Sequence, residues 1–156
     1  MKSTILVPYD FSPPAHAALR WAADLQKSTG AGPLQVIHAV SALNIVAGDL
    51  PVSVLVPTEE QMQEIEKDMG EAARALGARV VARVVVQAST VGDIILEEAR
   101  AADADLIVMG THGRSALKRF FLGGTADHVV RHATCPVVTV RKPEAHVASA
   151  ETRRAV

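Results

Sequence analysis

The 156-residue chain has few of the features that anchor a protein outside the cytoplasm. It contains one cysteine, Cys135, which excludes an internal disulfide and a cysteine-rich zinc module. It has no apolar run long enough to span a membrane. No signal peptide is recognisable either, because Asp10 closes the first apolar run. These absences lead us to expect a cytoplasmic protein with no membrane partner.

The chain also lacks a charge imbalance, since 16 basic residues face 17 acidic ones and the net charge is −1. This balance gives no bulk attraction to nucleic acid or to anionic lipid. Hydrophobic residues make up 49% of the sequence and charged residues 21%, a composition that excludes disorder of the whole chain. A mass of 16.5 kDa is the size of one domain.

Short apolar runs alternate with segments of helical period along the whole chain. The runs predict five strands, at residues 4–7, 34–40, 79–86, 106–109 and 137–140. The helical segments follow residues 12, 58 and 90, and a last one covers 124–132. Such alternation predicts an α/β fold with an open parallel five-stranded sheet and helices on both faces.

Helix boundaries are marked by residues with capping chemistry. Ser12 before Pro13 reads as an N-cap, and Thr58 and Thr90 each begin a predicted capping box with the residue three positions later, Gln61 or Asp93. One connection, residues 41–57, is long and apolar without helical period. Loops of this length are usually functional or disordered, and our hypothesis is that it covers a site or a partner.

In parallel sheets of this kind, ligands bind beyond the carboxyl ends of the strands, where the strand order reverses. The fourth strand is followed by a glycine-rich, basic segment, residues 110–125. Gly123 and Gly124 precede a helix whose free N–H groups would attract an anion such as phosphate. Asp10, after the first strand, could accept a hydrogen bond from a ribose or an adenine amine.

Familiar nucleotide and hydrolase motifs are missing. The chain has no P-loop, its first strand is not followed by G-x-G-x-x-G, and it contains no G-x-S-x-G nucleophile elbow. No residue is recognisable as an activator of water, so the sequence predicts no catalytic residue. At most slow ATP hydrolysis is expected, and whether the protein is an enzyme stays open.

The pattern Gly110-x2-Gly113-x9-Gly123 resembles the phosphate- and ribose-binding motif of the universal stress protein (UspA-like) family, in its ATP-binding subclass. The opening residues 5–12, the segment 105–113 and the closing segment 130–137 are also similar to that family. The resemblance covers about residues 2–141, in order. It predicts a universal stress protein domain over 1–142 and a flexible tail over 143–156.

The resemblance implies a Rossmann-like, adenine nucleotide alpha hydrolase-like sheet of order 3-2-1-4-5. It implies a homodimer paired through the last strand, Val137–Val140, and a stress-response switch or interaction module with an unknown protein partner. It also implies ATP, with Mg²⁺ bound through the phosphates. Adenine would lie by Asp10 and Ala39 and the ribose by Gly110. The full set of implied nucleotide-binding residues is Pro8, Tyr9, Asp10, Ala39, Met109, Gly110, His112, Gly113, Arg114, Gly123, Gly124 and Thr125.

One position departs from the family pattern. A Ser or Thr usually follows the third glycine, but Gly124 stands there and Thr125 comes one residue later. A phosphate-directed hydroxyl is therefore lost or displaced. The alternatives are a protein of the same fold that binds no nucleotide, or one that binds AMP or cyclic AMP. RNA binding through Gly110-x-x-Gly113 is disfavoured, because in KH domains that loop joins two helices.

Several single residues have a simpler interpretation than a functional one. His128 and His132 have the spacing of a two-histidine metal site, but the segment is not H-E-x-x-H, and a solvated helix face is the better interpretation. His38 is expected to pack in the core. Cys135 has no neighbouring base in the sequence and is expected to be structural, and no metal site is predicted.

Overall fold

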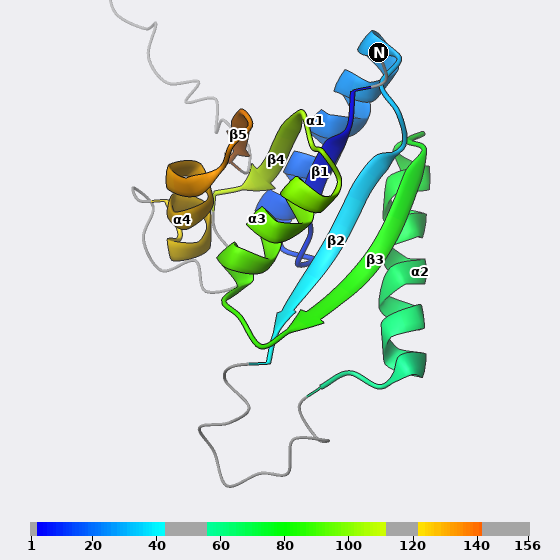
Figure 1. The fold of residues 1–156 in the computed structure, drawn as a ribbon. Helices are drawn as coiled ribbons and strands as arrows, with labels where there is room; N and C mark the ends of the chain where they lie inside the picture. The colour runs from blue at the N-terminus through cyan, green and yellow to red at the C-terminus, as the bar shows by residue number, and fades with distance from the viewer. Residues whose placement is uncertain (1–2, 43–55, 112–121, 142–156) are drawn as a thin grey trace, which may run out of the picture.

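The computed structural model describes residues 3–42, 56–111 and 122–141. They form a single parallel sheet in the order β3-β2-β1-β4-β5, which confirms the predicted fold class and strand order (Figure 1). The strands are β1 (Ile5–Pro8), β2 (Leu34–Ser41), β3 (Val80–Gln87), β4 (Leu106–Gly110) and β5 (Val137–Val140). The helices are α1 (Pro13–Thr29), α2 (Glu59–Ala75), α3 (Val91–Ala101) and α4 (Gly124–His132).

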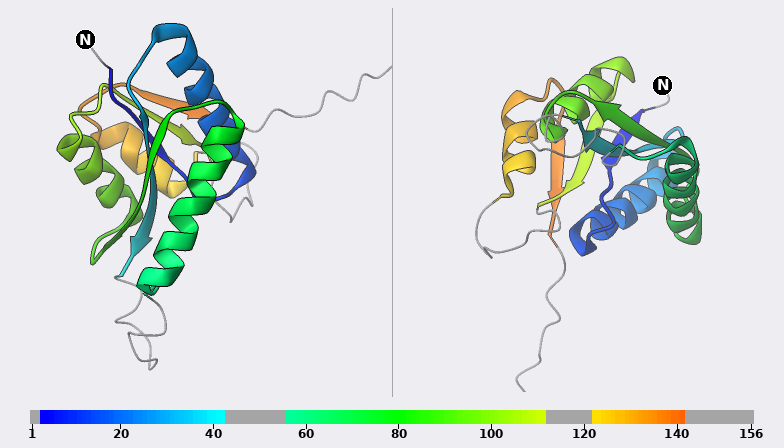
Figure 2. Two further views of the ribbon diagram at one scale, coloured as in Figure 1. Left: turned by 90° about the vertical axis from the view of Figure 1, so that its right-hand side faces the viewer. Right: turned by 90° about the horizontal axis from the view of Figure 1, so that it is seen from below.

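The sheet lies between two helical layers, as Figure 2 shows from the side and from below. Side chains of β1 alternate between the layers: Val7 packs with α1 and α2, whereas Leu6 packs with α3 and α4. All four residues of β1 are buried, because this central strand is covered on both faces. The uninterrupted apolar run that opens the sequence is the signature of this position.

The strand order reverses at β1, which pairs with β2 on one side and β4 on the other. The chain returns from β3 through α3 to reach β4 on the far side of β1. The carboxyl ends of β1 and β4 therefore diverge into a crevice, which is the usual ligand position in such sheets. This topology places the β1–α1 turn, the start of α3 and the start of α4 around one opening.

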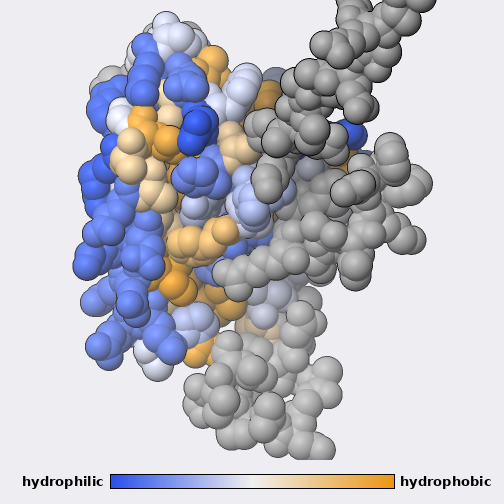
Figure 3. Space-filling model, turned by 180° about the vertical axis from the view of Figure 1, so that it is seen from behind, coloured by the Kyte–Doolittle hydropathy of each residue, from blue (hydrophilic) through white to orange (hydrophobic). Residues whose placement is uncertain are grey.

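On the reverse face of the molecule, hydrophilic and hydrophobic side chains gather in different places (Figure 3). Hydrophilic side chains gather over α2, which carries a run of acidic and basic residues. Trp21 of α1 is a partly exposed apolar side chain, at 40% exposure. In the part of the chain that the structure describes, no helix is long and apolar enough to cross a membrane.

Two sequence predictions lie outside the described residues. The proposed cover, residues 41–57, falls mostly on 43–55, and the predicted tail covers 143–156. The domain boundary at residue 142 also stays a prediction. The predicted strand boundaries agree with the structure to within one residue, and the last helix and the last strand agree fully.

Candidate functional site

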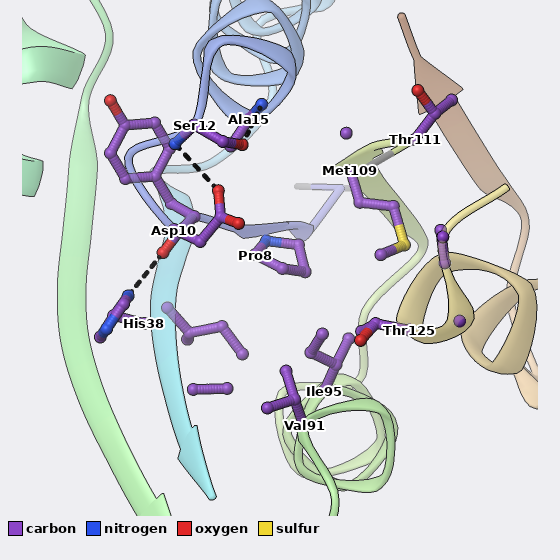
Figure 4. Close-up of a pocket in the computed structure, with 17 residues that line it drawn as sticks. Pro8, Asp10, Ser12, Ala15, His38, Val91, Ile95, Met109, Thr111 and Thr125 are labelled. Carbon is purple, nitrogen blue, oxygen red and sulfur yellow. Dashed lines mark hydrogen bonds between the residues drawn. The ribbon is translucent and has the colours of Figure 1, made fainter. Parts of the chain in front are cut away.

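A pocket of about 200 Å³ opens at the carboxyl ends of β1 and β4 (Figure 4). Four segments far apart in the sequence form its walls: the β1–α1 turn, the end of β2, the start of α3 and the β4–α4 region. The lining residues are Pro8, Tyr9, Asp10, Ser12, Ala15, Ile37, His38, Ala39, Val91, Ile95, Met109, Gly110, Thr111, Gly123, Gly124, Thr125 and Ala126.

The β1–α1 turn holds a carboxylate at the pocket. The Asp10 Oδ1 atom accepts a hydrogen bond from the Ser12 backbone N–H at 3.0 Å, and the Ser12 hydroxyl accepts one from the Ala15 N–H at 3.3 Å. The first bond is an Asx turn and the second is the N-cap of α1. Phe11 between them has a φ of 63°, which a residue with a side chain rarely adopts. The orientation of Asp10 is thus fixed by the local backbone.

His38 at the end of β2 is fastened to the same turn. Its Nδ1 atom donates to the Tyr9 carbonyl oxygen at 2.8 Å, since a carbonyl can only accept. The expectation of a packed core histidine is therefore wrong in part, because His38 is half-buried and lines the pocket. Burial, and secondly the charge of Asp10, raise the pKa of the Tyr9 phenol above its usual value, so it stays protonated at neutral pH.

The start of α4 differs from the other helix starts. Gly123 is its N-cap, with extended backbone angles (φ −61°, ψ 152°) and no side-chain capping bond. The first N–H groups of an α-helix have no partner within the helix, and they carry the positive end of its dipole. Gly124 and Thr125 follow directly and line the pocket. This helix start is suited to an anion.

Two glycines at the pocket are there for different reasons. A Cβ on Gly110 would lie 2.8 Å from the Ala15 nitrogen and from the Pro14 carbonyl carbon, so its small size is required by packing against α1. A Cβ on Gly124 would meet no atom within 4 Å. The absence of a side chain at Gly110 serves the fold, whereas Gly124 leaves open space at the start of α4.

The wall of the pocket formed by the start of α3 and the ends of β1 and β4 is apolar. Val91 and Ile95 of α3 lie below the pocket in Figure 4, while Pro8 lies between Asp10 and Thr125 and Met109 lies above Thr125. Ile95 and Met109 belong to the core cluster under α3 and α4, so this wall is part of the hydrophobic core. A flat apolar group such as a nucleobase would fit against it, with polar groups at the two ends.

Nine of the twelve residues predicted from the sequence line this pocket; the other three, His112, Gly113 and Arg114, lie outside the described residues. Sequence reasoning missed the α3 wall, because Val91 and Ile95 have the spacing of ordinary core positions. It also missed the buried Thr111. Among the described residues, no group of three or more His, Cys, Asp or Glu side chains is placed to hold a metal ion.

Comparison with known proteins agrees with the sequence resemblance. Residues 1–141 match the universal stress protein family. A universal stress protein of Thermus aquaticus is 33% identical over 141 residues, which is 90% of this chain and 100% of that protein. One from Methanocaldococcus jannaschii is 36% identical over 86 residues, and this match spans 55% of the chain but only 49% of that relative.

Solved structures share the fold. The universal stress protein from Archaeoglobus fulgidus in complex with dAMP superposes with a TM-score of 0.61, at 22% identity, over 90% of this chain and 98% of that one. At this identity the likeness concerns the fold alone. The match of residues 1–141, together with the full-length relative, shows the family: the chain belongs to the universal stress protein family.

Proposed function

We propose that this protein binds an adenine nucleotide in the pocket at the ends of β1 and β4, with ATP as the ligand. The observation that carries the proposal is the start of α4. Its N-cap, Gly123, supplies no side chain, and its first turn lines the same pocket as Asp10. Unpartnered helix N–H groups favour phosphate, while a carboxylate suits the hydroxyl or amino groups of a nucleoside.

The pocket divides into two ends of different chemistry. Gly123, Gly124 and Thr125 form the phosphate end, and the sequence adds Gly113 and Arg114 to it. Asp10 and Ala39 form the adenine end, where the resemblance places the base. Val91 and Ile95 of α3 form an apolar wall of the pocket, which would exclude water from one face of the base. The residues present therefore fit the ligand that the family implies.

Magnesium enters the proposal through the nucleotide. The described residues offer no carboxylate cluster for a metal, so Mg²⁺ would be held by the phosphate oxygens. The cation would add positive charge to that of Arg114 and the start of α4. The protein's own part is to orient the phosphates with backbone N–H groups and to hold the base.

We further propose that the nucleotide serves as a switch in a cytoplasmic, dimeric stress-response protein that engages another protein. The two sheet edges support the dimer. At the β3 edge, the Val84 N–H donates to the Glu66 carboxylate of α2 at 2.9 Å. No described side chain bonds to the outer edge of β5 in this way. An open edge strand can pair with a second copy. Light scattering should give twice 16.5 kDa, and the monomer mass would contradict this proposal.

A second candidate ligand is a nucleoside monophosphate, AMP or cyclic AMP. Gly124 supplies no hydroxyl at the phosphate end, which weakens the case for a triphosphate. A protein of the same fold has been solved with a monophosphate, dAMP. A protein with the same fold but no nucleotide is the remaining alternative.

Calorimetric titration of nucleotide-free protein distinguishes these ligands. Mg-ATP, AMP and cyclic AMP are each titrated at two temperatures, because a binding enthalpy can pass through zero at one of them. Micromolar binding of Mg-ATP near one site per chain, tighter than either monophosphate, supports the proposal. Tighter AMP or cyclic AMP supports the second candidate. No heat with any of the three, together with an unchanged melting temperature, would exclude nucleotide binding.

A further inference from the structure

Behind the phosphate end of the pocket, α3 and α4 are joined by a polar contact. The His128 Nε2 atom lies 2.8 Å from Asp93 Oδ1, and the Thr90 hydroxyl donates to Asp93 Oδ2 at 2.6 Å. Thr90 also caps α3 by accepting from the Asp93 N–H at 3.2 Å. The predicted capping box is therefore only half present, because the Asp93 carboxylate is bonded to the Thr90 hydroxyl and to His128 of the other helix.

His128 belongs only in part to the solvated helix face that the sequence predicts, because its ring also contacts α3. Its ring packs so closely on Gly92 that a Cβ there would lie 2.6 Å from the His128 Cδ2 atom. His128 and Asp93 are 37% and 43% exposed, so the contact is at the rim of the helix interface. Gly92 thus permits the close approach of α4 to the first turn of α3.

Both ends of this contact lie next to the pocket wall. Asp93 follows Val91 by two positions, and Val91 lines the pocket from the start of α3. His128 lies one helical turn after Gly124 and Thr125, which line it from the start of α4. α4 is a short helix of nine residues. A bond in its middle therefore affects the placement of its first turn.

We propose that the Asp93–His128 contact positions the first turn of α4 at the pocket, and that protonation of His128 strengthens this positioning. His128 is thus a positioning residue, whose effect on a ligand is exerted through the N–H groups of the α4 start. The consequence for nucleotide affinity rests on the proposed function. The positioning of α4 itself does not.

The charges around His128 define the expected direction. From α3 it faces Asp93, whose pKa is held below its usual value by the Thr90 hydroxyl and by His128, so this carboxylate is charged at neutral pH. On α4 its ring lies 4.5 Å from that of His132, while Asp127 and Arg131 are paired with each other at 2.8 Å. An imidazolium attracts the Asp93 carboxylate more strongly than an imidazole does.

The test compares wild type with His128→Gln and Asp93→Asn, and uses Arg131→Gln as the matched control. Arg131→Gln breaks an ion pair within α4 that does not reach α3. His128→Gln retains a hydrogen-bond donor without the titration. Mg-ATP is titrated calorimetrically at pH 8 and pH 6. We expect the ratio of dissociation constants, pH 8 over pH 6, to be at least threefold larger in wild type and Arg131→Gln than in the other two variants. Equal ratios in all four proteins would overturn the inference, since proton uptake by ATP itself is common to them.

Amide hydrogen exchange without nucleotide gives the second readout. At residues 127–130, whose N–H groups are bonded within α4 from the Asp127 N–H to the Gly123 carbonyl oxygen onward, exchange should be faster in Asp93→Asn than in wild type, and the difference should be larger at pH 6 than at pH 8 after correction for intrinsic rates. Arg131→Gln should match wild type. Identical exchange in all the proteins would overturn the positioning claim. Absence of nucleotide binding together with the expected exchange pattern would contradict the proposed function alone.

Discussion

The start of α4 and the starts of the other three helices solve the same problem in opposite ways. At α1, α2 and α3, the N-cap residues Ser12, Thr58 and Thr90 each accept a bond from the N–H three residues on. At α4 the N-cap is Gly123, which has no side chain to accept one. The protein caps three helix starts with its own side chains, whereas the start of α4 has no side-chain cap.

The difference shows where the fold reserves binding capacity. α1, α3 and α4 all begin at the pocket, so proximity alone does not distinguish them. Capping does, because a hydroxyl that satisfies the first N–H groups competes with an external anion for them. Only at α4, among the helix starts that the structure describes, are these groups available without displacing a side chain. The predictions below test this contrast.

The largest effect on stability is expected at the close contact between Gly110 of β4 and the start of α1. Gly110→Ala would place a Cβ 2.8 Å from backbone atoms of Pro14 and Ala15, which cannot move away as a flexible side chain could. We expect a loss of about 3 kcal/mol in the free energy of unfolding, measured by urea denaturation. Gly124→Ala is the control, since its Cβ meets no atom within 4 Å. A loss below about 0.5 kcal/mol in Gly110→Ala would show that the start of α1 is not tightly packed on β4.

The contrast can be removed by capping α4. Gly123→Asp would supply the missing acceptor together with a negative charge, and its extended backbone angles accept a side chain. We expect the protein to be more stable by about 0.5–1 kcal/mol, and to bind Mg-ATP more weakly by about 2 kcal/mol, roughly thirtyfold.

Gly123→Asn is the matched variant, which caps without the charge. Its affinity should fall less than that of Gly123→Asp, and calorimetry measures both. Unchanged affinity in the two variants would show that the start of α4 is not the phosphate site.

The sequence predicted the fold well because each element carries a local signal. The buried run of β1 and the capping residues Ser12, Thr58 and Thr90 each specify structure over a few neighbours. The site was predicted less completely. In the sequence, Gly110 suggests a position where a ligand approaches the backbone. In the structure its missing side chain makes room for the start of α1, which only the packing of distant segments reveals. The contact of Asp93 with His128 joins residues 35 positions apart and leaves no local pattern. His112, Gly113 and Arg114 lie outside the described residues, and their roles stay predictions.

The capped start of α2 is remote from the pocket, so its cap should contribute to the free energy of unfolding but not to the affinity for nucleotide. Thr58→Ala removes one half of the capping box at α2, the bond from the Gln61 N–H to the Thr58 hydroxyl at 3.3 Å. The other half, in which the backbone N–H of residue 58 donates to Gln61 Oε1 at 2.9 Å, needs no side chain at residue 58. We expect a loss of about 1 kcal/mol in the free energy of unfolding by urea denaturation. The affinity for Mg-ATP should equal that of wild type under conditions where both are folded. A parallel loss of affinity would mean that α2 takes part in binding.

The smallest effect is expected from a variant that adds a phosphate-binding hydroxyl to the uncapped start of α4. Gly124→Ser places a hydroxyl after the N-cap, at the position where the sequence resemblance predicts one, and a Cβ there meets no atom within 4 Å. The hydroxyl should add one hydrogen bond to a phosphate oxygen, worth about 0.5–1 kcal/mol, so that Mg-ATP binds two- to fivefold more tightly. Gly124→Ala adds the same carbon without the hydroxyl and should not increase affinity. Calorimetric titration of both variants against wild type measures the difference. If serine and alanine act alike, the phosphates do not reach the first residue of α4, and the open start would bind its anion through Gly123 and Thr125 alone.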